Sequence, residues 1–322
     1  MHHSDPLARS VSMRQTQGFM STGRVVAKED PAAPVVQFQR ILVATDFSSA
    51  AQSALDYALG MARKLHSKIF LVHAIPSGVS QYVSPEASEE VIQKARDFAA
   101  QEMKQLVEDS GCADFVQAEI LCCGAIWPQL QDFAKINGVD LIVLGTHGRS
   151  ATRKPLLGPV AEEIFRLAER PILTVGPRAE TEEVGREGIR RILYATNFKP
   201  HAERAAGFAY ALEREQNAQL TVLHVVEEPV DTPKAGHEIV EDFMTQRMKR
   251  GIPAICIGKC EPVFQVRFGE PAKEILDLAR AEHSDLIVLG MRSGKHATGQ
   301  LPSAVAYKLA CQSTCPVLTV RR

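Results

Sequence analysis

Four residues in the first half of the chain have the types and spacing of a site for a phosphate and a sugar. Gly145 and Gly148 follow an apolar run, and Gly158 comes after nine further residues, directly before a predicted helix. Glycines let the backbone approach a phosphate closely, and N–H groups at a helix N-terminus attract anions. Asp46 follows another apolar run, where its carboxylate could accept hydrogen bonds from a sugar or a base. The glycines alone are weak evidence, and their combination with the acid is stronger.

Strands and helices in a fixed order must position these residues. Apolar runs predict strands at residues 41–44, 69–73, 141–144 and 172–175, and alternating polarity predicts another at 115–122. Periodic apolar positions predict helices from 49 to 65, from 85 to about 108, from 126 to 136 and from 160 to 168, with Ser48 as a cap of the first helix. This alternation indicates a parallel sheet with helices on both faces. The ligand crevice of such a sheet lies beyond the carboxyl ends of its strands.

The chain contains this pattern twice. The sequence DLIVLG at 140–145 recurs at 285–290, and RILVATDF at 40–47 returns as RILYATNF at 191–198. Two domains also fit a length of 322 residues. We therefore predict an α/β protein with two doubly wound five-stranded parallel-sheet domains in tandem. The expected boundaries are a mobile tail at 1–39, domains at 40–177 and 190–322, and a linker at 178–189.

The second copy has lost most of the site residues. Asn197 replaces Asp46, Ser293 and Ser303 replace the second and third glycines, and Gly290 remains. A basic loop with Arg292, Lys295 and His296 could hold an anion, although a solvated loop is the favoured interpretation. The ligand is therefore expected in the first copy.

Composition excludes several classes of protein. A formal net charge of −1 gives no electrostatic basis for binding nucleic acid or an anionic membrane. No apolar run has the length of a membrane span, and the first residues lack the apolar region of a secretory signal, so a cytoplasmic location is expected. The seven cysteines include no CxxC. Buried reduced thiols are favoured over a metal or redox pair at Cys256 and Cys260 or at Cys311 and Cys315.

Common catalytic motifs are missing from the sequence. It contains neither a GxxxxGK[ST] phosphate loop nor a GxSxG nucleophile elbow. The HxGH signature of related nucleotidyl-transferring folds is also absent, with Thr146-His147-Gly148 as the nearest approach. A structural role is favoured for His73 and His224, and a surface location for Glu162 and Glu163. Binding is therefore favoured over catalysis.

These motifs together resemble a known family. The spacing Gly-x2-Gly-x9-Gly after a DLIVLG-type strand, with ATDFS after the first strand, is similar to the universal stress protein family, particularly its tandem members. The resemblance covers about residues 40–176 and 190–322. It implies an adenine nucleotide alpha hydrolase-like fold in each domain and a role in stress adaptation. It also implies an intramolecular pseudo-dimer in which residues 171–175 pair with residues 317–320, and it leaves a homo-oligomer open.

The ATP-binding branch of that family implies a set of binding residues. Asp46 and the backbone of Ala74 would contact the adenine–ribose end of the nucleotide. The ribose and phosphates would contact Gly145, His147, Gly148, Gly158 and the helix start at Pro159 and Val160. The implied cofactor is ATP, and Mg²⁺ bound with the nucleotide is left open.

Pro159 departs from the family pattern, which has serine or threonine after the third glycine. Proline removes a hydroxyl and a backbone N–H from the phosphate site. Alternatively, Pro159 begins a helix at the position where proline is favoured. Three functions therefore stay open: ATP-dependent binding, an ATP-independent interaction scaffold and slow nucleotide hydrolysis.

Overall fold

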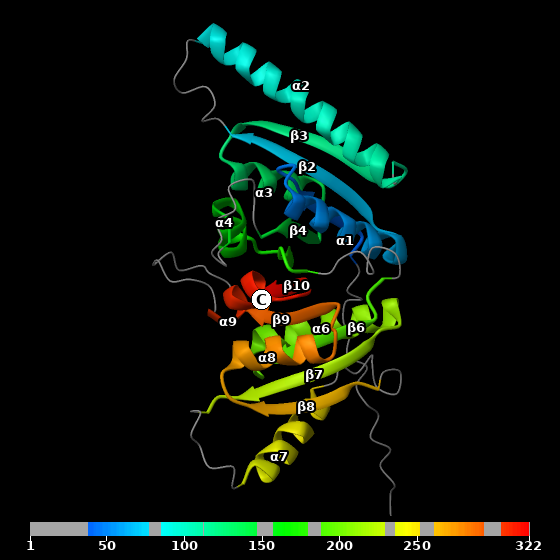
Figure 1. Cartoon of the computed structure of the whole chain (residues 1–322), viewed down its shortest axis with the longest axis vertical. Helices are drawn as coiled ribbons and strands as arrows, with labels where there is room; N and C mark the ends of the chain where they lie inside the picture. Colours follow the sequence, from blue (N-terminus) through cyan, green and yellow to red (C-terminus); the bar gives the residue numbers. More distant parts are fainter. Residues whose placement is uncertain are drawn as a thin grey trace, which may run out of the picture. The chain divides into compact units, whose positions relative to one another are not determined.

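A computed structural model of the chain describes residues 38–76, 85–111, 113–146, 157–179, 188–228, 236–251, 261–292 and 304–321. Within these ranges, ten strands form one sheet in the order β3-β2-β1-β4-β5-β10-β9-β6-β7-β8 (Figure 1). The elements of the first half are β1 (Arg40–Ala44), α1 (Ser49–Leu65), β2 (Lys68–Pro76), α2 (Pro85–Ser110), β3 (Val116–Gly124), α3 (Ile126–Ile136), β4 (Leu141–Gly145), α4 (Pro159–Leu167) and β5 (Ile172–Val175). Those of the second half are β6 (Arg191–Thr196), α6 (Pro200–Gln216), β7 (Gln219–Val226), α7 (His237–Arg250), β8 (Val263–Phe268), α8 (Pro271–Ala281), β9 (Leu286–Met291), α9 (Ala304–Gln312) and β10 (Val317–Arg321).

Each half is a doubly wound parallel sheet. The order β3-β2-β1-β4-β5 of the first half corresponds strand by strand to β8-β7-β6-β9-β10 of the second. The neighbouring strands within each half are parallel. The predicted fold class is confirmed. In each half, the first two crossovers place the second and third strands on one side of the first strand, and the next two place the fourth and fifth strands on its other side. Such a reversal of the strand order leaves a crevice at the carboxyl ends of the central strands.

The last strands join the two halves. β5 and β10 are antiparallel, with Leu173 opposite Leu318. The Thr174 hydroxyl donates to the carbonyl of Val317, and the Thr319 hydroxyl donates to the carbonyl of Ile172, each at 3.3 Å. These two bonds are related by the approximate twofold symmetry of the duplicated chain. The pairing is the one that the resemblance implied, and it removes two apolar sheet edges from water.

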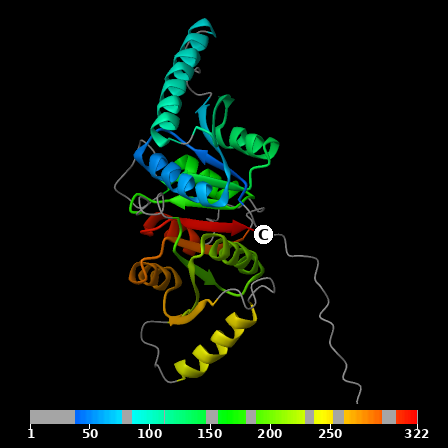
Figure 2. The ribbon, with the colours of Figure 1, turned by 90° about the vertical axis from the view of Figure 1, so that its right-hand side faces the viewer.

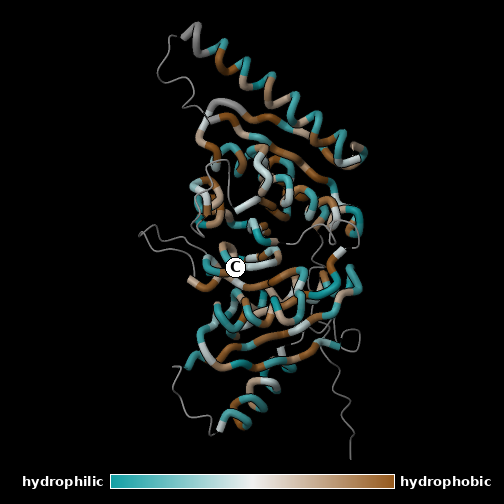
Figure 3. Tube along the Cα trace, viewed as in Figure 1, coloured by the Kyte–Doolittle hydropathy of each residue, from teal (hydrophilic) through white to brown (hydrophobic). Residues whose placement is uncertain are grey.

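Helices cover both faces of the sheet (Figure 2). One core contains residues of α1, α2, α6 and α7 packed on the strands, and the other contains residues of α3, α4, α8 and α9. Each core continues through both halves of the sheet. The strands are largely apolar along their length (Figure 3), as expected when helices cover both faces. No helix in the described ranges is long and apolar enough to cross a membrane.

Local features agree with several of the sequence predictions. Ser48 is the N-cap of α1, and its hydroxyl accepts a hydrogen bond from the N–H of Ala51 at 3.2 Å. Cys311 and Cys315 are free and buried, and burial raises the pKa of their thiols to about 11 and about 12. Both thiols are therefore protonated at neutral pH, as expected of cysteines that act as small apolar residues. Cys256 and Cys260 lie outside the described residues.

Placing a charge in the joint between the halves should separate them. Leu318 is 1% exposed, whereas Val263 on the edge strand β8 is 40% exposed. Leu318→Glu should lower the free energy of unfolding by about 3 kcal/mol or more, because a buried carboxylate loses its hydration. Val263→Glu is the matched control, for which a change within about 0.5 kcal/mol is expected. Urea denaturation gives both values, and small-angle scattering should show an expanded particle for Leu318→Glu only. Equal effects of the two substitutions would contradict the pairing.

Candidate functional site

A cavity of about 310 Å³ lies at the carboxyl ends of the central strands of the first half. The ends of β1, β2 and β4 line it together with α1, α3 and the beginning of α4. The structure brings together six of the predicted binding residues there: Asp46, Ala74, Gly145, Gly158, Pro159 and Val160. The other two, His147 and Gly148, lie outside the described residues.

Asp46 is held in a turn of fixed geometry. The next residue, Phe47, has a φ of 63°, which is rare for a side chain of its size. The hydroxyl of Thr45 accepts a hydrogen bond from the N–H of Phe47 at 3.1 Å, and Oδ1 of Asp46 accepts one from the N–H of Ser48 at 3.0 Å. These bonds hold the carboxylate at the wall of the cavity, where it gives the described lining its negative charge.

His73 supports this turn from β2. Its Nδ1 lies 2.9 Å from the carbonyl oxygen of Thr45, and its ring lies 4.5 Å from the ring of Phe47. Because a carbonyl only accepts, Nδ1 carries the hydrogen. The second half repeats both contacts with His224, Thr196 and Phe198, at 2.9 Å and 4.5 Å. The repetition agrees with the structural role that the sequence favoured for these histidines.

Gly145 is required by packing as well as by its place in the cavity. A Cβ atom at this position would lie 2.7 Å from the backbone carbon of Ala50 at the start of α1. In the second half, a Cβ on Gly290 would lie 2.2 Å from the carbonyl oxygen of His201. Both glycines therefore allow a helix to begin directly above the end of a strand. This requirement explains why Gly290 remains in the copy that has lost the other glycines.

Several backbone N–H groups at the start of α4 are not available to bind an anion. Gly158 is the N-cap, and Pro159 occupies the first helical position, so the helix-start interpretation of the proline is confirmed. The N–H of Gly158 donates to the carbonyl of Thr146 at 2.8 Å, and the N–H of Leu157 donates to the Tyr307 hydroxyl at 3.4 Å. Proline has no N–H. An anion at this helix start would therefore meet the amides of Val160 and of the residue after it, which lack intrahelical acceptors.

The corresponding turn of the second half has different chemistry. Asn197 replaces the acid, and its Oδ1 accepts a hydrogen bond from the N–H of Lys199 at 3.2 Å. Its Nδ2 lies 3.3 Å from Nε2 of His201, a residue that stands where the first half has Ala50. Burial lowers the pKa of His201, and the neighbouring Arg292 and Lys199 lower it further. The amide therefore keeps the turn and loses the negative charge. Ser293, Lys295, His296 and Ser303 lie outside the described residues.

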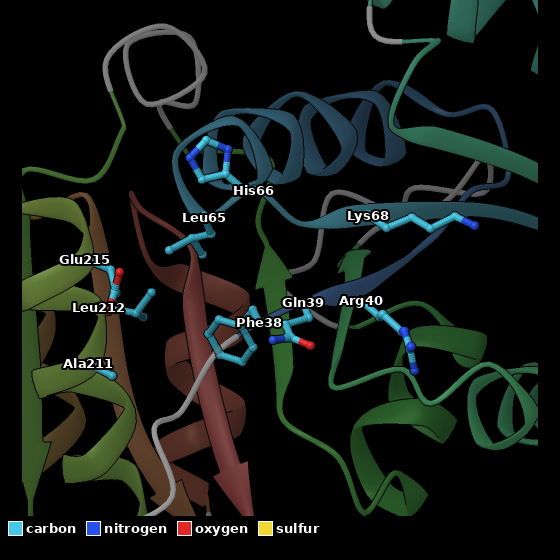
Figure 4. Close-up of a pocket in the computed structure, with 9 residues that line it drawn as sticks. All are labelled: Phe38, Gln39, Arg40, Leu65, His66, Lys68, Ala211, Leu212 and Glu215. Carbon is cyan, nitrogen blue, oxygen red and sulfur yellow. The ribbon is translucent and has the colours of Figure 1, made fainter.

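A second cavity, of about 390 Å³, lies at the opposite ends of β1 and β2, beside α6. Its basic side chains do not converge (Figure 4). Lys68 extends over the ring of Phe70, with 4.8 Å from Nζ to the ring centroid, and Nη1 of Arg40 lies 3.4 Å from the Asn137 carbonyl. In Figure 4 both side chains point away from Glu215 on the other wall. The polar groups of this cavity do not face a common point.

Among the residues that the structure describes, no group of three or more His, Cys, Asp or Glu side chains has the arrangement of a metal site.

Comparison with known proteins identifies related chains. A model described as the universal stress protein family matches residues 37–176 and 188–321. A universal stress protein of Mycobacterium tuberculosis is 25% identical over 297 residues, covering 87% of this chain and 96% of that relative. One of Thermus aquaticus is 33% identical over 139 residues, covering 41% of this chain and 99% of that relative. The crystal structure of a universal stress protein from Archaeoglobus fulgidus has a TM-score of 0.65 at 20% identity, covering 89% of this chain and 100% of that one. The last comparison shows the shared fold.

Adding one methyl group at Gly145 should test the packing argument. Gly145→Ala should lower the free energy of unfolding by about 1–3 kcal/mol, because α1 must move away from β4. At Gly207, in the middle of α6, an added Cβ would have no atom within 4 Å. Gly207→Ala should therefore raise the free energy of unfolding by about 0.5–1 kcal/mol through its better helix propensity. Thermal or urea denaturation measures both, and effects of the same sign would contradict the assignment.

Proposed function

Because the chain belongs to the universal stress protein family, we propose that its first half binds one adenine nucleotide in the cavity beside Asp46. Binding would act in stress adaptation by changing the conformation of the protein or its affinity for a partner. The observation that carries this proposal is the meeting of a fixed carboxylate, an apolar wall and a helix N-terminus in one cavity.

The charges of the cavity suggest how the ligand is oriented. Asp46 would repel phosphate groups and accept hydrogen bonds from ribose hydroxyls. The apolar wall of the cavity suits the faces of a base and a sugar. Its side chains are those of Val72, Ile126, Leu130, Leu144 and Ile164. The phosphates would then lie toward the start of α4, where the amides of Val160 and its neighbour and the helix dipole favour negative charge.

The size of the cavity agrees with such a ligand. Its volume of about 310 Å³ lies near the lower end of the range of small-molecule sites. An adenosine group would occupy the enclosed part, and the phosphates would extend to the mouth. Mg²⁺ would bind together with the phosphates.

The differences between the two halves support a single site. Both halves keep the turn, its histidine and its packing glycine. Only the first half has a carboxylate at the end of the turn, and the second has Asn197 with a cationic neighbourhood around His201. The main alternative is a scaffold that binds no nucleotide. Pro159 favours this alternative, because it lacks the hydroxyl and the N–H that would bind a phosphate.

Exchanging the acid and the amide between the halves tests the proposal directly. Asp46→Asn should weaken ADP binding about 10- to 100-fold, because hydrogen bonds to a charged group contribute about 1.5–3 kcal/mol. The turn should survive, since Asn197 makes the same backbone contact in the second half. Asn197→Asp is the matched control and should leave the affinity unchanged. Titration calorimetry on the full chain measures both. A wild-type chain that binds neither ADP nor ATP would overturn the proposed function.

Restoring a hydroxyl and an N–H at the helix start should strengthen the phosphate contacts. Pro159→Ser should bind ATP about five- to tenfold more tightly, since each added hydrogen bond contributes about 1 kcal/mol and more to a charged acceptor. Adenosine has no phosphate, so its affinity should not change. Equal or weaker ATP binding by a folded variant would show that the phosphates do not reach this position.

A further inference from the structure

Helix α4 of the first half is held at both ends by side chains of the second half. Its nine residues give a length of about 13 Å, at 1.5 Å per residue. Tyr307, on α9, contacts the residue that precedes the N-cap, and Arg321, at the end of β10, contacts the last turn. Contacts at both ends of so short a helix fix the direction of its axis, and with it the place of its N-terminus at the cavity.

Arg321 holds the C-terminal end. The residue is 3% exposed, and its Nη1 donates to the carbonyl of Arg166 at 2.8 Å. Its Nη2 donates to the carbonyl of Phe165. Carbonyls in the last turn of a helix lack intrahelical partners and carry the negative end of the helix dipole. A buried cation is therefore stabilised at this place and would be costly to leave unpaired.

Tyr307 holds the N-terminal end. Its hydroxyl accepts a hydrogen bond from the N–H of Leu157 at 3.4 Å. Its ring meets that of Phe165 edge to face, with 6.4 Å between centroids and 78° between planes. Tyr307 therefore contacts both the residue before the N-cap of α4 and the buried face of the helix.

The corresponding positions of the first half do not carry these side chains. In the late part of the repeat the copies are offset by 145 residues, which places Glu162 at the position of Tyr307 and Gly176 at that of Arg321. A Cβ on Gly176 would lie 3.6 Å from the carbonyl oxygen of Ala310, the counterpart of Phe165. Gly176 thus faces the counterpart of the carbonyl that Arg321 binds, but it has no side chain with which to bind it. The long side chains act on the helix that borders the cavity and not on its counterpart α9.

We propose that Tyr307 and Arg321 are positioning residues through which the second half sets the affinity of the first half for the phosphates of its ligand. This inference rests on the proposed nucleotide site. The second half, whose own site residues have changed, then serves as the support that orders the first. Because coupling between two equilibria is reciprocal, a bound nucleotide also strengthens the contact between α4 and the second half.

The test compares ligands that share the adenosine group and differ in phosphates. Tyr307→Phe and Arg321→Gln in the full chain should weaken ADP binding about threefold to tenfold, on the scale of one or two hydrogen bonds. They should leave adenosine binding within about twofold, because adenosine lacks the phosphates that the amides at the start of α4 would bind. Arg321→Lys keeps the charge and should recover part of the loss. Lys308→Gln is the control, since Lys308 neighbours Tyr307 in sequence and pairs with Glu270 at 3.1 Å.

Hydrogen exchange supplies a readout that does not depend on a ligand. The amides of α4 should exchange faster in Tyr307→Phe and Arg321→Gln than in the wild-type chain, while those of α9 should not change. Unchanged ADP affinity in both variants, with wild-type binding intact, would overturn the inference and leave the proposed function standing. Equal losses for ADP and adenosine would also overturn it, because they would indicate a general loss of structure. A wild-type chain that binds no nucleotide would overturn the proposed function, and this inference with it.

Discussion

The antiparallel pairing of β5 with β10 is the contact on which the other features depend. It joins two five-stranded sheets into one and lets each of the two cores continue through both halves. Its hydroxyl–carbonyl bonds satisfy Thr174 and Thr319, which would otherwise be polar groups without partners in a buried sheet. The same pairing brings α9 and the end of β10 against α4. Without it, the helix that borders the cavity would lose its support from the second half.

Comparison of the two halves separates what the fold requires from what a ligand would require. Both keep the threonine and histidine that form the turn and the glycine that lets a helix begin above a strand end. Asp46 and Asn197, which occupy the same place in the turn, differ in charge, and Tyr307 and Arg321 stand where the first half has Glu162 and Gly176. The shared positions are those at which a larger or differently bonded side chain would disrupt packing. The exchange of Asp46 for Asn197 leaves the backbone contact of the turn intact.

Much of the fold could be predicted from the sequence because its signals are local. Apolar runs marked the strands, Ser48 marked a helix start, and the repeat gave the number of halves. The binding interpretation of Gly145 missed its contact with Ala50, which lies 95 positions earlier in the chain and appears only when α1 is placed over β4. Tyr307 and Arg321 were missed for the same reason, since their partners lie about 150 residues away. A comparison of each repeat position with its counterpart could have identified both residues. Tyr307 corresponds to a glutamate and Arg321 to a glycine, and such differences indicate a contact that only one half makes.

The central claim is that one half binds a nucleotide and the other half supports it. Native mass spectrometry of the full chain in excess ADP tests this claim most directly, because it counts ligands on each molecule. The account predicts one nucleotide per chain, with no second occupancy as the ligand concentration rises. Two nucleotides per chain would show that the second half also binds, and none would show that neither half does; either result would contradict the account.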